Sequence, residues 1–222
     1  MNTISDKIHH LRASIPEGVQ IVAVSKFHPI EALREAYEAG QRIFGESRQQ
    51  ELLHKIPLMP DDTIWHFIGH LQTNKVRSIV GRVSMIESVD TERLLNIIDS
   101  ESEKAGVESR VLLQVHVAKE ETKFGFTPDE LLEFFASGRY HSLKATRLCG
   151  VMGMASNTDD MERVRADFRA IALTRRRISE IATDLPDFTT ISMGMTHDYH
   201  EAIACGSTLV RIGTLIFGER EY

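Results

Sequence analysis

Lys26 is the residue of this chain whose type and position most directly suggest chemistry. It follows the apolar run 21–24, which is typical of a buried strand, and His28 and Pro29 end that strand soon after it. An amine at the mouth of a buried strand is partly desolvated, which favours its neutral, nucleophilic form and allows a Schiff base with an aldehyde. Taken alone, however, such a lysine more often extends its charge into solvent.

A second chemical feature stands near the other end of the sequence. There the apolar run 209–217 carries one arginine, Arg211, followed by Gly213 and Thr214. A glycine before a hydroxyl residue lets backbone N–H groups approach a phosphate, while the arginine adds a fixed charge and a planar set of donors. An aldehyde-trapping lysine and a phosphate-binding turn together suggest one ligand, pyridoxal phosphate (PLP).

The composition is that of a soluble globular protein. The 222 residues, 42% of them hydrophobic, suffice for one core, and no linker divides them, so we expect a single domain over residues 1–222. A net charge of −6 argues against nucleic acid or an anionic membrane as a partner. With no signal-peptide pattern, no run of about 20 apolar residues and only Cys149 and Cys205 as cysteines, we expect a cytoplasmic protein.

Strand-like runs alternate with helix-period segments along the whole sequence. Eight strands are expected, at 21–26, 42–46, 63–69, 83–89, 110–117, 148–154, 189–194 and 209–217. Helices are expected near 5–14, from Pro29 to Gly40, from Asp90 or Thr91 to Gly106, from the capping box at 127–130, and over 161–181. This alternation predicts an α/β fold in which a parallel sheet closes as a (β/α)8 TIM barrel. An open doubly wound sheet is the alternative, but GxGxxG does not follow the first strand.

A barrel would bring the candidate residues together. Active sites of such barrels lie at the carboxyl ends of the strands, often with a phosphate site after the seventh and eighth. Lys26 ends the first expected strand, Ser192 and Met193 end the seventh, and Gly213 and Thr214 lie on the eighth. Because the first and eighth strands are neighbours in a closed barrel, we expect one shared site. The helix near 5–14 is expected to plug the bottom of the barrel.

Six blocks of sequence, spread over nearly the whole chain, resemble the YggS/PROSC family of PLP-binding proteins. They are Val24-Ser25-Lys26, Phe44-Gly45-Glu46, Trp65-His66-Phe67-Ile68-Gly69-His70-Leu71-Gln72-Thr73-Asn74-Lys75, Lys123-Phe124-Gly125-Phe126, Ser192-Met193-Gly194-Met195 and Arg211-Ile212-Gly213-Thr214-Leu215-Ile216-Phe217-Gly218. The resemblance implies the fold-type III barrel of the alanine racemase N-terminal domain and a role in vitamin B6 homeostasis.

The same resemblance implies roles for individual residues. Lys26 would hold PLP as a Schiff base, Arg211 would face the pyridine nitrogen, and Ser192, Gly213 and Thr214 would bind the phosphate, with Met193 beside them. An arginine stays charged and disfavours protonation of the neighbouring ring nitrogen, so the cofactor becomes a weaker electron sink. This argues against transaminase-like chemistry.

Two positions depart from the family pattern. The family often has a second lysine where this sequence has His28, and an asparagine where it has Ser47. If the second lysine helps to move the cofactor to acceptors, that step differs here, whereas the bond at Lys26 is retained. Ser47 is shorter than asparagine and would reach the ring through a bridging water.

Three functions are compatible with these residues. The first is a monomeric carrier without substantial enzymatic activity, which holds PLP and releases it to apo PLP-dependent enzymes. The second is an amino-acid racemase, which needs a second acid or base from His70 or a partner subunit, since none of the four tyrosines stands at a strand's carboxyl end. The third is a barrel for another phosphorylated metabolite, with Lys26 as an electrostatic clamp. No metal site is expected, because HExxH is absent and His66 and His70 lie on a strand and its exit.

Overall fold

The computed structural model describes residues 3–117 and 124–219, and the strands of this part form a closed parallel barrel in chain order. They are β1 (Gln20–Val24), β2 (Ile43–Glu46), β3 (Ile64–Phe67), β4 (Met85–Val89), β5 (Ser109–Val115), β6 (Thr146–Gly153), β7 (Thr190–Ser192) and β8 (Leu209–Ile212). β1 pairs with both β2 and β8, which closes the sheet. The predicted (β/α)8 barrel is therefore confirmed.

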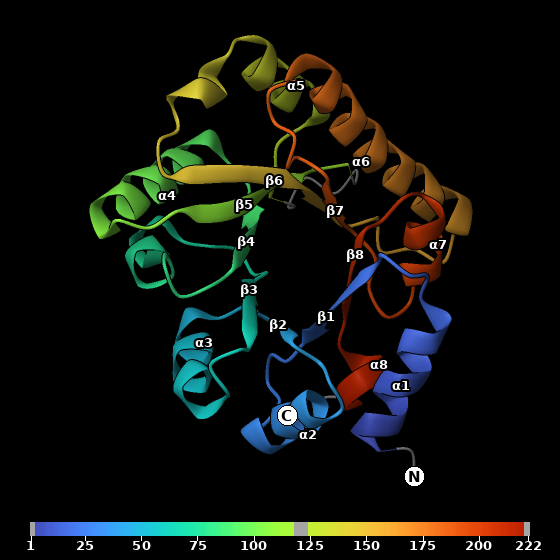
Figure 1. Cartoon of the computed structure of the whole chain (residues 1–222). Helices are drawn as coiled ribbons and strands as arrows, with labels where there is room; N and C mark the ends of the chain where they lie inside the picture. The colour runs from blue at the N-terminus through green and yellow to red at the C-terminus, as the bar shows by residue number, and fades with distance from the viewer. Residues whose placement is uncertain (1–2, 118–123, 220–222) are drawn as a thin grey trace.

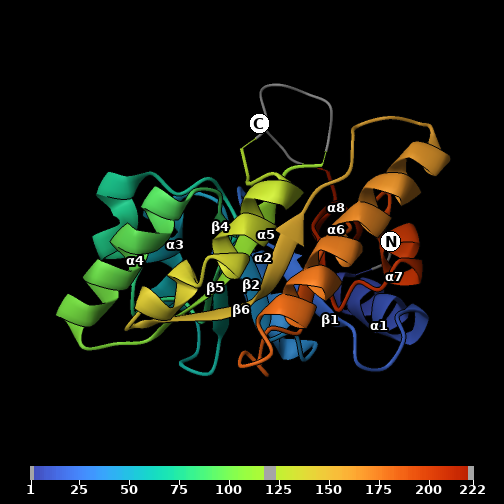
Figure 2. The ribbon, with the colours of Figure 1, turned by 90° about the horizontal axis from the view of Figure 1, so that it is seen from above.

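The helices surround this barrel on the outside, as Figure 1 shows. They are α1 (Ile4–Ser14), α2 (Ile30–Glu38), α3 (Gln49–Lys55), α4 (Glu92–Ala105), α5 (Pro128–Ala136), α6 (Met161–Ile181), α7 (Tyr199–Ala204) and α8 (Thr214–Phe217), with 3-10 segments η1 (Ile56–Leu58), η2 (Thr73–Ser78) and η3 (Arg139–Ser142). Seen from above, α5 and α6 lie side by side (Figure 2). Within the described residues, none of these helices combines the length and apolarity that a membrane crossing requires.

The ends of the longer helices follow the predicted signals. The Thr91 side chain accepts from the Leu94 N–H at the start of α4, and Gly106, with φ +67°, ends that helix. Thr127 forms a capping box with Glu130 at the start of α5. Local side-chain chemistry therefore sets where these two helices begin.

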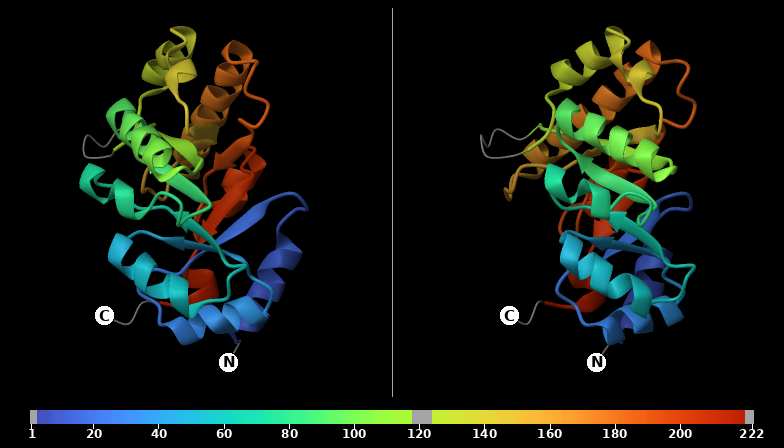
Figure 3. Two further views of the ribbon diagram at one scale, coloured as in Figure 1. Left: turned by 60° about the vertical axis from the view of Figure 1, so that its left-hand side comes forward. Right: turned by 90° about the vertical axis from the view of Figure 1, so that its left-hand side faces the viewer.

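Two features differ from the expected arrangement. The apolar run 209–217 is not one strand: β8 ends at Ile212, and α8 follows the turn at Gly213 and buries Ile216. Periodicity cannot separate so short an apolar helix from a strand. In addition, α1 lies in the helical ring against α2 and α8 and does not cross the bottom of the barrel, as Figure 3 shows.

Side chains alternate between the inside and the outside of the barrel wall. On β8, Val210 and Ile212 pack in the large apolar cluster between strands and helices, and Leu209 belongs to a separate, smaller cluster with Val22 of β1. Arg211 is the register partner of Val22, so its side chain enters the barrel interior. A charged residue is thus placed inside the barrel.

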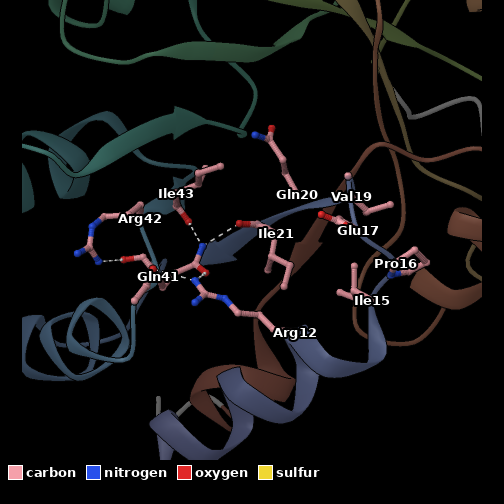
Figure 4. Close-up of a pocket in the computed structure, with 12 residues that line it drawn as sticks. Arg12, Ile15, Pro16, Glu17, Val19, Gln20, Ile21, Gln41, Arg42 and Ile43 are labelled. Atoms are coloured by element: carbon pink, nitrogen blue, oxygen red, sulfur yellow. Dashed lines mark hydrogen bonds between the residues drawn. The ribbon is translucent and has the colours of Figure 1, made fainter.

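The end of the barrel at which β1 and β2 begin contains a cavity of about 350 Å³ beside Arg12, shown in Figure 4. Two of its polar side chains, Arg12 and Gln41, are already engaged. Arg12 Nη2 donates to the Gly40 carbonyl at 2.8 Å and to Gln41 Oε1 at 3.3 Å, and Gln41 Nε2 donates to the Ile21 and Ile43 carbonyls. This network joins α1 to the end of α2 and to the first two strands, which indicates a structural role.

We expect Arg12→Ala to lower the free energy of unfolding by about 1 kcal/mol, because it removes charged donors from the carbonyls that follow α2. Urea unfolding monitored by circular dichroism measures this loss. Arg77→Ala is the matched control, since no bond from the Arg77 side chain to the described residues is found. Equal stability of the two variants would contradict the structural role.

Candidate functional site

A cavity of about 220 Å³ opens at the carboxyl ends of the strands. The lining residues come from β1 and β8 and from the segments after β1, β3, β6, β7 and β8: Val24, Lys26, His28, Ile68, Met154, Met195, Thr196, His197, Arg211, Gly213, Thr214 and Gly218. Lys26, Arg211, Gly213 and Thr214 are thus brought together as the barrel topology predicts, although up to 188 positions (214 − 26) separate them in the sequence. One cavity combines an amine, a guanidinium and a Gly-Thr turn.

The turn that carries Lys26 is held in an uncommon backbone conformation. Phe27, the next residue, has φ +68°, a left-handed value that a bulky residue adopts only when its surroundings impose it. Its backbone N–H donates to Glu51 Oε1 of α3 at 2.6 Å. On the other side, the Ser25 N–H donates to the Gly45 carbonyl of β2 at 3.1 Å. Lys26 is therefore flanked by two residues whose backbones are tied to neighbouring elements.

A buried lysine, Lys55, organises the attachment of this turn. Its Nζ donates to the Ser25 carbonyl at 2.8 Å, to Glu46 Oε1 at 2.8 Å and to Glu51 Oε1 at 2.6 Å. Burial raises the pKa of Glu46, against the effect of the nearby Lys55 charge. Three hydrogen bonds satisfy the three protons of the ammonium group, so Lys55 is fully occupied in holding the turn and α3 together.

Arg211 is held beneath the cavity by bonds to β6 and β7. Nη1 donates to the carbonyl and the hydroxyl of Ser192, at 2.9 and 2.6 Å, and Nη2 donates to the Gly153 carbonyl at 3.0 Å. Burial lowers the pKa of Arg211, and the negative charge of Glu87 opposes that shift. Its bonds to the described residues use Nη1 and Nη2 and not Nε. The guanidinium is therefore fixed in place with Nε still able to donate to a ligand.

Glu87 of β4 balances this buried charge. His66 Nδ1 donates to Glu87 Oε1 at 2.6 Å, the Ser192 hydroxyl donates to Oε2 at 2.5 Å, and Arg211 Nη1 lies 3.9 Å from Oε2. Burial alone would raise the pKa of Glu87, but the hydrogen bond from His66 and the charges of His66 and Arg211 outweigh it, so the pKa is lowered. Four strands of the barrel thus contribute to one polar network below the cavity.

This network predicts a pH dependence of stability. Because the pKa of Glu87 is lower in the folded protein than its ordinary value of 4.5, its contribution is present above pH 4.5 and is lost as the pH falls through the lowered value. We expect Glu87→Gln to reduce the fall in unfolding free energy between about pH 6 and about pH 3. Urea titrations of both proteins at each pH measure it, and identical pH profiles would contradict the role of Glu87. The raised pKa of Glu46 acts in the opposite sense in both proteins.

The remaining predicted site residues lie near the cavity but do not line it. Ser192 and Met193 are fully buried below it, with Ser192 between Arg211 and Glu87. Ser47 lines a neighbouring cavity, and His70 lines that one as well. His70 thus does not line the cavity that contains Lys26, where a racemase would need a second acid or base.

Two histidines have positions that were not predicted. His197 is exposed and lines the mouth of the cavity together with Lys26. His28, which takes the place of a lysine in the family pattern, lines it too, and its ring stacks on Phe217 of α8 at 4.8 Å between centroids. Lys123 and Tyr222 lie outside the described residues.

Sequence analysis did not identify Lys55, Glu51 or Glu87. A signal for Glu87 was present, because an acidic residue in the apolar run 83–89 must find a buried partner. Lys55 and Glu51 gave no such signal, since a Glu and a Lys four residues apart on a short helix are usual at a surface. The burial of Lys55 follows from how α3 packs against the turn at Lys26.

Comparisons with known proteins agree with this architecture. The family model described as "Alanine racemase, N-terminal domain" matches residues 1–221. A protein of Schizosaccharomyces pombe named "Pyridoxal phosphate homeostasis protein" is 40% identical over 229 residues, covering 99% of this chain and 94% of its own. One of the same name from Aquifex aeolicus is 40% identical over 205 residues, covering 91% and 88%.

Solved structures extend the similarity. PipY of Synechococcus elongatus, described as a COG0325 family member, superposes with a TM-score of 0.92 without PLP and 0.86 with PLP bound, at 35% identity. Each superposition covers 97% of this chain and 100% of PipY. An alanine racemase of Clostridium difficile has a TM-score of 0.78 at 10% identity, and all of this chain covers 58% of it. That last match reflects the shared fold alone.

Proposed function

Because this chain belongs to the family of pyridoxal phosphate homeostasis proteins built on the alanine racemase N-terminal domain, we propose that it binds PLP in the Lys26 cavity and serves PLP homeostasis in the cytoplasm. The observation that carries the proposal is that one cavity combines the Lys26 amine, the buried Arg211 and the Gly213-Thr214 turn. PipY, which is similar over its whole length, has been solved with PLP bound.

The cavity fits the chemical groups of this cofactor. Gly213 itself is not under backbone strain, since its φ is −114° and an added β-carbon would lie 3.4 Å from Val24, an ordinary contact. Thr214 is exposed beside it. When bound, PLP supplies an aldehyde that forms a Schiff base with a lysine amine, and Lys26 is the lysine that lines this cavity.

Each chain residue then has a defined task. Lys26 anchors the ligand, Gly213 and Thr214 bind its phosphate, and Arg211 faces its ring nitrogen through Nε. Ser192 and Met193 support this floor from below, with Ser192 orienting Arg211. Ser47, in the segment after β2, would reach the ring through a bridging water. A guanidinium fixed by Ser192 and Gly153 keeps its protons and donates no proton to the ring, which favours storage of the cofactor over electron-withdrawing catalysis.

Within this function we propose a single-domain monomer that carries PLP to apo PLP-dependent enzymes. The test loads the protein with PLP, removes free PLP by gel filtration, and follows activation of an apo-transaminase in the presence of an aldehyde scavenger. We expect activation by the loaded protein to survive a scavenger concentration that abolishes activation by the same amount of free PLP. Equal inhibition of both would contradict the carrier role.

The alternative, an amino-acid racemase, predicts turnover. Among the described residues no tyrosine lines the cavity; its histidines are the half-buried His28 and the exposed His197, and His197 is the one tested here as a second acid or base. We expect racemisation of alanine and serine by the loaded protein to stay at the rate of free PLP. A faster rate that is lost in His197→Asn would replace the carrier proposal by the racemase.

A further inference from the structure

A second cavity, of about 330 Å³, lies beside the Lys26 cavity on the same face of the barrel. The segments after β2 and β3 line it, and Gly69 and Ser47 make the close contact between these two segments. A β-carbon at position 69 would lie 2.2 Å from the Ser47 carbonyl oxygen, so only glycine allows this approach. Much of the sequence block 65–75 therefore forms a cavity that the proposed PLP site does not use.

Two cationic side chains of this cavity have no acidic partner in the described part of the chain. Arg48 and Lys75 both line it, and neither has a carboxylate within ion-pair distance among the residues described. The nearby acids are engaged elsewhere, because Glu51 binds Lys55 and Asp90 binds His70. In a protein with a net charge of −6, this cavity concentrates positive charge without neutralising it.

The donors of the cavity are held in place by neighbours that leave them available. His70 Nδ1 donates to Asp90 Oδ2 at 2.7 Å and its ring stacks on Phe124 at 4.1 Å, so Nε2 is the ring nitrogen that can contact a ligand. The Arg48 guanidinium lies 4.6 Å from the centroid of the Phe27 ring, a contact that consumes none of its N–H donors. Such preorganisation lowers the entropy cost of binding an anion.

We propose that this second cavity binds the phosphate group of a small molecule, independently of the Lys26 cavity. An arginine fork and a lysine charge match the charge and the several acceptor oxygens of a phosphate monoester. The volume accommodates more than the phosphate itself, which points to a phosphorylated metabolite as its ligand. No residue lines both cavities, and Ser47 is the one residue of the PLP proposal that lines the second.

The test is a titration of the full-length protein with inorganic phosphate at constant ionic strength, followed by amide proton–nitrogen correlation spectra. We expect saturable shifts at the amides of Arg48, Gln72 and Lys75. Lys75→Gln should weaken this binding about tenfold or more, because it removes a charged donor. Arg77→Gln is the charge-matched control on the same 3-10 segment, since Arg77 lines a different pocket, and it should leave the affinity unchanged.

Shifts confined to Gly213 and Thr214 would overturn this inference and support phosphate binding in the Lys26 cavity. Shifts confined to the second cavity would support this inference and count against phosphate binding in the Lys26 cavity. Equal affinities of Lys75→Gln and Arg77→Gln would overturn the assignment of the binding residues. Succinate, titrated in the same way, distinguishes a carboxylate from a phosphate. Tighter binding of succinate than of phosphate would overturn the ligand class.

Discussion

Replacing Lys26 by alanine is expected to abolish covalent retention of PLP. The wild-type protein mixed with PLP should show a visible absorption band of the Schiff base, and borohydride should convert it to a product that survives denaturation and gel filtration. In Lys26→Ala the band and the retained cofactor should both be absent, because Lys26 is the lysine that lines the cavity. Absorption spectra and intact mass before and after reduction measure the effect.

Lys75→Ala is the matched control for this prediction. Lys75 lies on the same face of the barrel but lines the neighbouring cavity, so its loss should leave the band unchanged. A band of equal strength in Lys26→Ala would remove Lys26 from its proposed role. Loss of the band in both variants would instead indicate that the anchoring depends on the charge of this face.

Replacing Lys55 by methionine is expected to destabilise the protein by about 3 to 5 kcal/mol, because it leaves the buried carboxylate of Glu46 without its charged partner. The change should also release the Ser25 carbonyl and the Glu51 carboxylate that hold the turn of Lys26. We therefore expect weaker PLP retention in Lys55→Met even under conditions in which the variant is folded. Urea unfolding and the visible band measure the two effects.

A double-mutant cycle with Glu46→Gln separates the ion pair from the loss of packing. If Lys55 acts through Glu46, the coupling free energy between the two positions should exceed about 1 kcal/mol. Strict additivity of the two substitutions would contradict the cluster as a unit. If Lys55→Met folds and still retains PLP fully, the turn at Lys26 needs no support from α3.

The fold could be predicted from sequence because its evidence is periodic and local. Each of the eight expected strands overlaps an observed one, and the signals at Thr91, Gly106 and Thr127 coincide with the helix ends. The exception was the run after Ile212, where three apolar residues allowed either a strand or a helix and the turn at Gly213 decided the outcome. Tertiary packing, which places α1 in the ring of helices, left no periodic signal.

The site could be predicted only in part. Barrel topology makes β1 and β8 neighbours and so brings together Lys26, Arg211, Gly213 and Thr214. This proximity could be predicted by counting the expected strands along the sequence. Partnerships such as Lys55 with Glu46 depend on three-dimensional burial instead. Lys55 lies 2.6 to 2.8 Å from its partners, which are up to 30 positions away in the sequence. No sequence pattern marks these contacts, because Glu and Lys are also common on surface helices.

The pairing of β1 with β8 has a consequence for the biosynthesis of the protein. Lys26 is translated early, yet Arg211, Gly213 and Thr214 emerge from the ribosome nearly two hundred residues later. A nascent chain therefore displays the amine of Lys26 long before the other residues of the proposed PLP site have been synthesised. Closure of the barrel, a long-range and intrinsically slow contact, is the event that creates the complete site. Ligand that stabilises this closed form then favours the last step of folding by mass action.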